Sequence, residues 1–520
     1  MAWGVLEVDG LETVPGTTLL SKKEDLAGDV ASNASLKKAG DIVLIPQPSD
    51  SVNDPLNWSE TKKNVIIWIL ALASGVTVSL GPMVTPGFGE VIEDYKVTLD
   101  QVATYLVGVL VLATGTGTFF TSAAATVWGK RPIFVISIFV LLVTCAWGFY
   151  TTSFVSLAVM RGIQGAAGAP VETLVTSTVS DLFFVHQRGQ KLAIWGLAVL
   201  CGVLLGQVIA GVVIQQLGFS SAFGITALIY VLILPAMYFF VPETDYQRKK
   251  TESTFISEKQ QAIELEIQEL EAKTTFGDSL ALFNGRVSDA SFWKTAFKPV
   301  PLITFPAVIF STFVYGTFQT WLVSFSLLSV NIFSAPPYNL NAAQIGLTNL
   351  PQLFLGLFAT GVSGWFADWI AGYMSRRNKG IYEPEFRLTL MIPGVIFSTI
   401  GFLGFGISVG QGAPVFWPIF FMTVNSMAVP FATSASFTYV IDCHPKDANQ
   451  AFVTINFVKA VFTFLASLFV NGWLSKVGPQ MVFVTIGILN LGICSFTIPI
   501  YVFGKRFRRM IARSSTLNKL

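Results

Sequence analysis

Long stretches without a charged residue alternate along this chain with short charged segments. The uncharged runs cover 64–89, 101–129, 132–160, 192–242, 299–367, 388–441, 460–475 and 477–504. A helix needs about 20 apolar residues to cross the hydrocarbon core of a bilayer. Three runs are too long for one crossing, and turn-forming residues divide them near 215–221, 336–339 and 410–414. Together with 154–178, which contains only Arg161 and Glu172 as charges, the pattern predicts twelve transmembrane helices.

The segment 245–298 is the only long hydrophilic stretch in the interior of the chain, and it separates six predicted helices from six. It divides the chain into a segment before the first helix (1–63), a six-helix half (64–244), a central loop (245–298), a second six-helix half (299–504) and a tail (505–520). Two halves of matching topology are typical of transporters built from repeats. We therefore expect an all-α polytopic membrane protein with twelve helices in two six-helix halves.

The distribution of lysine and arginine predicts the orientation of these helices, because cytosolic loops carry an excess of both residues. With the N-terminus inside, 29 of the 33 basic residues fall in cytosolic segments. Two fall outside (Lys96 and Lys476), and two fall within predicted helices (Arg161 and Lys459). We expect both termini and the central loop in the cytosol, with the protein in the plasma membrane.

Composition supports a membrane protein and narrows its chemistry. Hydrophobic residues make up 52% of the chain and charged residues 12%, whereas a soluble protein carries about a quarter charged residues. The net charge of +2 gives no reason to expect nucleic acid. The four cysteines lie in or at the end of apolar runs, and no Gly-x-x-x-x-Gly-Lys loop is present. We expect no metal, no cofactor and no enzymatic site.

The charged residues inside the predicted helices are candidates for function, since a charge in the membrane costs several kcal/mol. Glu172 follows Arg161 by eleven residues, which places the two within roughly 20° of the same helix face. The functional interpretation of Glu172 is a carboxylate in a polar cavity that binds a proton or a cationic group. The alternative is a structural partner for a polar group on a neighbouring helix. Lys459 has the same two interpretations, because a lysine stem can also extend to the membrane surface.

Two sequence motifs resemble those of a known family. Arg161-Gly162-Ile163-Gln164-Gly165 resembles the fourth-helix signature of the major facilitator superfamily, in which the arginine is associated with proton coupling. In the fifth predicted helix, the spacing of Gly202, Gly206, Gln207 and Gly211 is similar to the antiporter motif of the twelve-helix drug:proton exporters. Gln207 replaces the proline of that motif, so we expect a continuous helix there.

Further segments between residues 43 and 506, such as Asn53-Asp54-Pro55-Leu56-Asn57-Trp58-Ser59, resemble fungal facilitators related to the yeast histidinol and polyamine transporter. The resemblance implies a central cavity lined by the first, fourth, seventh and tenth helices. Polar or amphipathic residues within those helices are candidates to line it: Thr77, Tyr315, Gln319, Asn425 and Tyr439, beside Glu172 and, in the eleventh helix, Lys459. Acidic residues at the cytosolic helix ends are candidate gate residues: Asp181, Asp368 and Asp442.

These observations predict a secondary-active transporter that works by alternating access. Glu172, Arg161 and the resemblance favour protons as the coupling ion. We expect efflux of a small toxic compound or secondary metabolite. Proton-coupled uptake of polyamines or other organic cations is the alternative, and a non-transporting membrane sensor is a third hypothesis. The expected partners are a small-molecule substrate, the lipid bilayer and protons, and the protein is expected to be a monomer.

Overall fold

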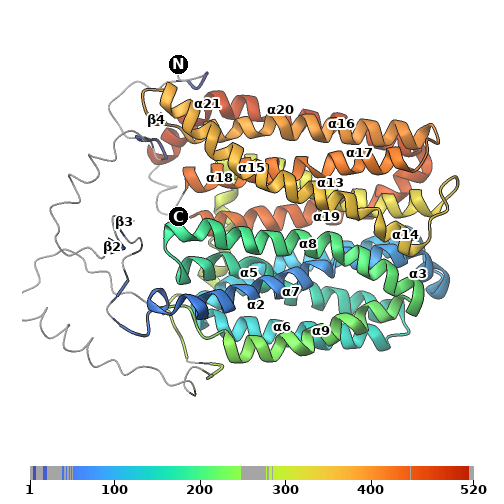
Figure 1. The fold of residues 1–520 in the computed structure, drawn as a ribbon, viewed down its shortest axis with the longest axis horizontal. Helices are drawn as coiled ribbons and strands as arrows, with labels where there is room; N and C mark the ends of the chain where they lie inside the picture. Colours follow the sequence, from blue (N-terminus) through green and yellow to red (C-terminus); the bar gives the residue numbers. More distant parts are fainter. Residues whose placement is uncertain are drawn as a thin grey trace, which may run out of the picture.

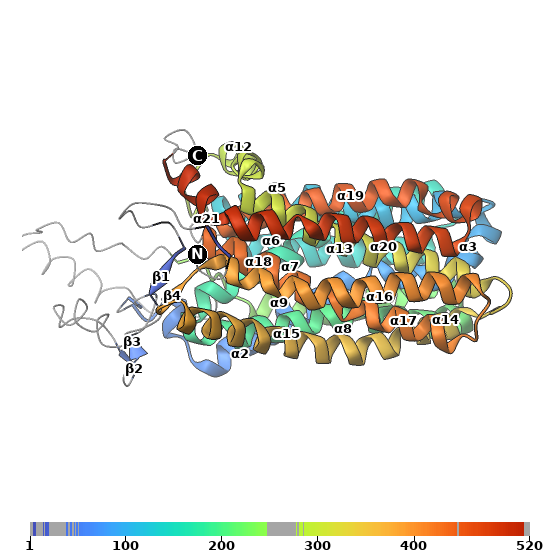
Figure 2. The ribbon, with the colours of Figure 1, turned by 90° about the horizontal axis from the view of Figure 1, so that it is seen from above.

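The computed structural model describes residues 51–246, 285–444 and 447–513, residues 277 and 280–283, and short pieces before residue 50 (4–6, 14, 16–19, 38–39, 42–43, 46 and 48–49). The chain forms a bundle of long helices that run along one common direction (Figure 1). The strand β1 (Thr18–Leu19) and the end of helix α21 (Thr497–Arg513) lie at the same end of this bundle (Figure 2). We call it the terminal end and the opposite end the loop end.

The first six long helices form what we call the N half. They are α2 (Glu60–Ser79), α5 (Val109–Trp128), α6 (Lys130–Tyr150), α7 (Phe154–Leu182), α8 (Val185–Leu217) and α9 (Phe219–Phe240). Short elements join α2 to α5 at the loop end: η2 (Pro82–Gly87), α3 (Phe88–Tyr95), α4 (Leu99–Val102) and the π-helical turn η3 (Ala103–Gly108). Single glycines with positive φ, Gly129 (89°) and Gly218 (83°), separate α5 from α6 and α8 from α9. Only glycine adopts such a conformation readily, so each reverses the chain in one residue.

The last long helices form the C half. They are α13 (Pro306–Ser334), α15 (Asn349–Arg377), α16 (Met391–Gly410), α17 (Phe416–Ser426), α18 (Ala428–Cys443), α19 (Ala448–Val477), α20 (Pro479–Ser495) and α21. Interruptions near Met427 and Phe496 split two of the membrane crossings into the pairs α17–α18 and α20–α21. The short helix α14 (Ala342–Leu347) lies at the loop end, between α13 and α15 (Figure 1). The helix α12 (Phe292–Phe297) and the turns η1 (Pro55–Asn57), η4 (Val300–Thr304) and η5 (Pro384–Leu390) precede long helices.

The described chain has eleven helical segments long and apolar enough to cross a membrane. Helix α7, with 29 residues, is added to these eleven and brings the number of crossings to twelve. Its charges and small polar residues make it less apolar than the eleven segments. It packs against α2, α5 and α6 inside the bundle. Large apolar side chains cover the outside, where Leu232 is 74% exposed, as expected for a surface that faces lipid. The all-α class and the twelve crossings predicted from the sequence are confirmed.

The two halves contact each other at the loop end. Helix α8 packs against α14 and α15, and η3 and α5 pack against α19. Hydrogen bonds join the halves here: Thr104 Oγ1 donates to the carbonyl of Ser467 (3.1 Å), and the amide of Gly472 donates to Asp100 Oδ1 (3.1 Å). Figure 2, turned by 90°, shows the same bundle from above. A cavity lies between the halves, on the inner side of these contacts.

Short strands lie at the terminal end. Strand β1 pairs antiparallel with β4 (Ile381–Tyr382), which precedes η5 of the C half, and β2 (Lys38–Ala39) pairs with β3 (Ile42–Val43). The predicted domain boundaries stay predictions, and much of the segments 1–63 and 245–298 and all of 514–520 fall outside the described residues. Helix α21 continues past the predicted boundary at residue 504 to Arg513.

Candidate functional site: a cavity between the two halves

The cavity has a volume of about 240 Å³ and is lined by helices from both halves. Its apolar wall includes Val78, Val107, Leu110, Leu322 and Met422. Its polar groups are mostly amides and hydroxyls, which neither repel nor strongly attract a charged ligand. They include Thr77, Thr114, Gln164, Gln207, Gln319, Asn349, Gln352, Asn425 and Asn456. Among the described lining residues, the charged side chains are Glu172 and Lys459.

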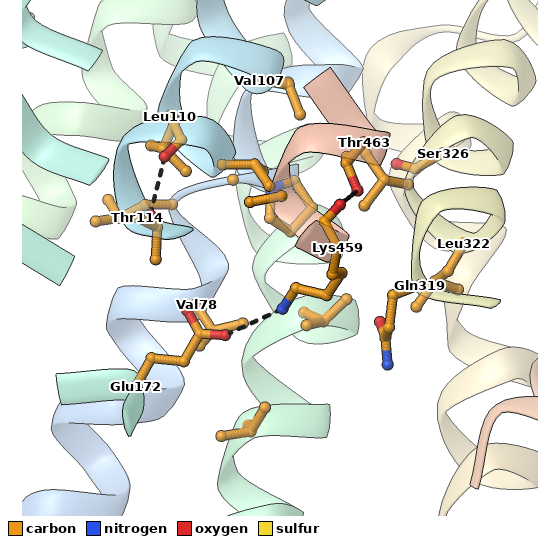
Figure 3. Close-up of a pocket in the computed structure, with 18 of the residues that line it drawn as sticks. Val78, Val107, Leu110, Thr114, Glu172, Gln319, Leu322, Ser326, Lys459 and Thr463 are labelled. Carbon is orange, nitrogen blue, oxygen red and sulfur yellow. Dashed lines mark hydrogen bonds and ion pairs between the residues drawn. The ribbon is translucent and has the colours of Figure 1, made fainter. Parts of the chain in front are cut away.

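Glu172 and Lys459 face each other across the cavity, one from each half (Figure 3). Glu172 lies on α7 and Lys459 on α19, and Lys459 Nζ lies 3.7 Å from Glu172 Oε1. The side chains are 31% and 16% exposed, so each charge retains some access to the cavity. Lys459 Nζ also lies 5.8 Å from the centre of the Tyr315 ring, within the range of a cation–π contact. The sequence identified both residues separately, and it did not predict that they pair.

Arg161 lies in a different environment, although it shares a helix with Glu172. Its side chain is fully buried and does not line the cavity. Its Nε donates to the carbonyl of Leu106 (2.6 Å), and its terminal nitrogens donate to the carbonyl of Leu80 (2.8 Å) and to Gln164 Oε1 (2.7 Å). These bonds fasten the loop-end turns after α2 and before α5 to α7. A part for Arg161 in proton coupling stays a prediction.

The other cavity candidates fall into two groups. Thr77, Tyr315, Gln319 and Asn425 line the cavity together with Glu172 and Lys459. Thr77 Oγ1 also shares a hydrogen bond with the hydroxyl of Tyr230 (3.0 Å). Tyr439 is not among the lining residues, because α18 turns it into the core of the C half. There its ring meets Phe310 edge to face at 5.9 Å.

The candidate gate residues pair with bases inside their own halves. In the N half, Asp181 accepts a hydrogen bond from Lys130 Nζ and one from Thr244 Oγ1 (3.3 Å). In the C half, Asp442 Oδ2 accepts from Arg387 Nε (2.8 Å). The exposed Asp368 lies 3.7 Å from the same guanidinium. Carboxylates in the last turn of α7 and in the last turn of α18 thus bind a base each, at corresponding places in the two halves.

The glycines of the α8 motif serve two different contacts. A Cβ at Gly202 would collide with the carbonyl of Gly75, and one at Gly206 would lie 2.6 Å from Ser79 Cβ, so both glycines let α8 approach α2 within the N half. A Cβ at Gly211 would lie 2.6 Å from the carbonyl of Ala342 on α14, in the C half. Small residues allow such close approach of helices in membranes. Helix α8 is continuous through Gln207, as the missing proline predicts.

The amides of Gln207, Asn349 and Gln352, which form a hydrogen-bonded group at the loop-end side of the cavity, were not predicted as a group. Gln207 was identified only through the α8 motif. The available signal was a set of amide side chains inside uncharged runs, where an amide needs a hydrogen-bond partner. That signal does not tell which helices supply the partners.

A two-half helical bundle with a cavity between the halves is typical of membrane transporters built from repeats. The model of the Major Facilitator Superfamily matches residues 65–467, and the chain belongs to this family.

Several curated relatives match over most of their length. "Protein HOL1" of Saccharomyces cerevisiae is 23% identical and aligns over 96% of this chain and 96% of its own length. "MFS-type transporter penM" of Penicillium rubens is 24% identical over 96% and 98%. "Efflux pump radE" of Floropilus chiversii is 22% identical over 80% and 75%. Among solved structures, a D-xylose–proton symporter has a TM-score of 0.61 at 13% identity, covering 85% of this chain and 99% of the other, which establishes the fold alone.

Proposed function

We propose that this transporter exports a small amphipathic organic molecule in exchange for protons, from a cytosol that lies at the terminal end, across the plasma membrane. The observation that supports this most is the pair Glu172–Lys459 in the cavity between the halves. A carboxylate in this position can take up and release a proton while a ligand binds beside it.

Coupling follows from competition at Glu172. Lys459 Nζ lies 3.7 Å from Glu172 Oε1, so this ion pair joins the two halves at the cavity. A proton on Glu172 removes the attraction between α7 and α19 at this point, so the protonated and ionised forms favour different arrangements of the two halves. A ligand that occupies the space beside Glu172 favours either the protonated or the ionised form of the carboxylate. The passage of the ligand is therefore linked to the passage of a proton.

The lining supports an amphipathic cargo and export. Amides and hydroxyls on one part of the wall and Val78, Leu110 and Leu322 on another match a molecule with both polar and apolar parts. A relative named as an efflux pump aligns over 80% of the chain. The three glycines of the α8 motif retain the spacing seen in exporters.

Glu172→Gln tests the proposal, since the amide keeps the shape of the side chain and cannot carry a proton. We expect cells with this variant to retain the same compounds as cells lacking the protein, as measured by untargeted mass spectrometry of cells and medium. The matched control is Glu93→Gln, because Glu93 is exposed at the loop end, outside the cavity. Normal pH-dependent export in Glu172→Gln, at wild-type expression, would assign Glu172 to structure.

Uptake of an organic cation is the second candidate function. It is favoured by the carboxylate of Glu172 near the ring of Tyr315, two groups that bind cations. Lys459 opposes it, because its ammonium already occupies this position. Spermidine supplied in the medium distinguishes the two functions. Lower spermidine accumulation in cells lacking the protein, with no compound retained, would establish uptake.

A further inference from the structure

Gln207 lies between the two halves, on the loop-end side of the cavity. It is ten residues before the end of α8 at Leu217, which places it roughly 15 Å from that end of the helix. Its side chain is 5% exposed and lines the cavity. It therefore stands between the cavity and the loop end, at the level where the halves meet.

The side-chain oxygen of Gln207 accepts hydrogen bonds from the opposite half. Ser326 Oγ on α13 and Asn349 Nδ2 on α15 each lie 3.2 Å from Gln207 Oε1. The amide of Asn349 is held in place by Gln352 Nε2, which donates to Asn349 Oδ1 (2.9 Å), and by its own bond to the carbonyl of Gly346 (3.1 Å). The donor is thus already oriented toward Gln207.

Close backbone contact brings these groups within reach. A Cβ at Gly346 on α14 would lie 2.7 Å from the carbonyl of Gln207, and Gly211 makes the matching approach one turn further along α8. A side chain at either glycine would separate α8 from α14. The hydrogen bonds of Gln207 consequently depend on direct contact between the halves.

Gln207 also has partners within its own half. Its Nε2 donates to the carbonyl of Val203 (3.4 Å), and Thr85 Oγ1 lies 3.5 Å from Oε1 while it donates to the carbonyl of Pro82 (2.8 Å). A separation of the halves at the loop end would break the bonds to Ser326 and Asn349 and would leave those to Thr85 and Val203, so the buried amide would keep a partner in both states.

We propose that Gln207 is the latch that holds the loop end closed, through the hydrogen bonds of its side-chain oxygen to Ser326 and Asn349. Opening of this end during alternating access breaks these two bonds and leaves Gln207 with its partners in the N half, Thr85 and Val203. The latch is a positioning device that does not depend on the direction of transport. A negative result in the test of the latch would leave the proposed export intact, and a negative result in the test of export would leave the latch intact.

Labelling of an introduced cysteine measures the opening of this end, while the native Cys145, Cys443 and Cys494 are buried. Val323→Cys places a thiol in the cavity wall, about one turn beyond Ser326 as seen from the loop end, in a chain whose half-buried Cys201 is replaced by alanine. A membrane-impermeant maleimide is applied from the loop-end side. We expect Gln207→Met to raise the labelling rate about tenfold, since loss of two neutral hydrogen bonds shifts a two-state equilibrium by about this factor.

The matched control is Gln215→Met, the same change two turns further along α8 at an exposed position. It should leave the rate unchanged. Ser326→Ala, which removes one bond from the other half, should raise the rate by a smaller factor, and it should add little when combined with Gln207→Met because both changes remove the same contact. Equal rates in wild type, Gln207→Met and Ser326→Ala would overturn the latch. If Gln207→Met does not fold, an unchanged rate in Ser326→Ala and in Asn349→Leu overturns it equally.

Discussion

At the scale of single residues, the two charges of α7 differ because of their depth in the bundle. Eleven residues place Arg161 and Glu172 on nearly the same face, and also separate them by roughly 16 Å along the axis. Arg161 lies at the level of the packed loop-end turns, where backbone carbonyls surround it. Glu172 lies at the level of the cavity, where Lys459 is its partner. Arg161 is buried without a carboxylate partner among the described residues, which suits a structural role. Glu172 is partly exposed, which suits a group that exchanges a proton.

His444, which follows α18 at the terminal end, makes stability depend on pH. Burial lowers the pKa of His444 from 6.5 to about 4, and among the described residues its Nε2 has no hydrogen-bond partner. The ring packs on Phe305 with 4.8 Å between centres. The carboxylate of Asp447 acts on the pKa in the opposite direction and the guanidinium of Arg508 in the same direction. The folded protein therefore favours the neutral imidazole.

We expect this contribution to be fully present above pH 6.5 and to be lost as the pH falls toward 4, because the unfolded chain binds the proton more readily. The loss is on the order of 3 kcal/mol. Replacing the imidazole by an apolar group in His444→Leu should remove this part of the pH dependence. Thermal unfolding of the purified protein in detergent between pH 7 and 4 measures it. Parallel curves for wild type and variant would show that His444 does not titrate in this range.

At the scale of elements, the helices were predictable and their lateral contacts were only partly so. Uncharged runs and turn residues located the crossings, because length and hydropathy alone determine which segments can span a bilayer. Which residues line the cavity depends also on how each helix is rotated about its axis and on where a helix is interrupted. Asn425 and Tyr439 lie 14 residues apart, within roughly 40° of one face on a continuous helix. The interruption at Met427 separates α17 from α18, and only Asn425 lines the cavity. The pairing of Glu172 with Lys459 depends on how the halves pack, which no local pattern encodes.

Helix α21 is fastened to the segment before α16 by a buried ionic cluster at the terminal end. Arg508 Nη2 lies 2.8 Å from a carboxylate oxygen of both Glu383 and Glu385, and Lys505 Nζ lies 2.5 Å from Glu383. Thr17, beside β1, donates to Glu383 (2.7 Å), so the N-terminal segment joins the same cluster. The cluster links three segments that are far apart in the sequence.

Arg508→Met should destabilise the protein by about 3–5 kcal/mol, since it leaves two buried carboxylates short of one cation. Arg506→Met is the matched control on the exposed side of the same helix, and we expect it to change stability by less than about 0.5 kcal/mol. Thermal unfolding in detergent measures both. Adding Glu385→Gln to Arg508→Met should recover part of the loss. Equal melting temperatures for the two arginine variants would contradict a structural role of the cluster.

At the scale of the whole molecule, two sets of contacts between the halves lie where alternating access requires contacts to break and re-form: at the cavity and on its loop-end side. The pair Glu172–Lys459 crosses the cavity, and Gln207 with the glycines Gly211 and Gly346 closes its loop-end side. At the terminal end, Asp181 and Asp442 bind bases within their own halves. A transporter of this architecture can move its halves largely as rigid bodies, because each half retains its internal bonds while the contacts between them exchange.

The orientation of this bundle in the membrane is the last prediction, and it follows from charge. Of the 33 lysines and arginines, 29 fall in segments assigned to the terminal end and two in segments assigned to the loop end. Since α12, which lies at the end of the central loop, and the end of α21 lie at the same end of the bundle (Figure 2), a reporter fused after Leu520 and one inserted near residue 260 should give the same result. We expect both to report the cytosol, because translocation of so many cations is disfavoured. Protease protection of tags at these sites in sealed vesicles gives an independent measurement. An external signal at both sites would reverse the orientation, and with it the direction in which the proposed exporter works. Signals that differ between the two sites would contradict an even number of crossings between residue 260 and Leu520.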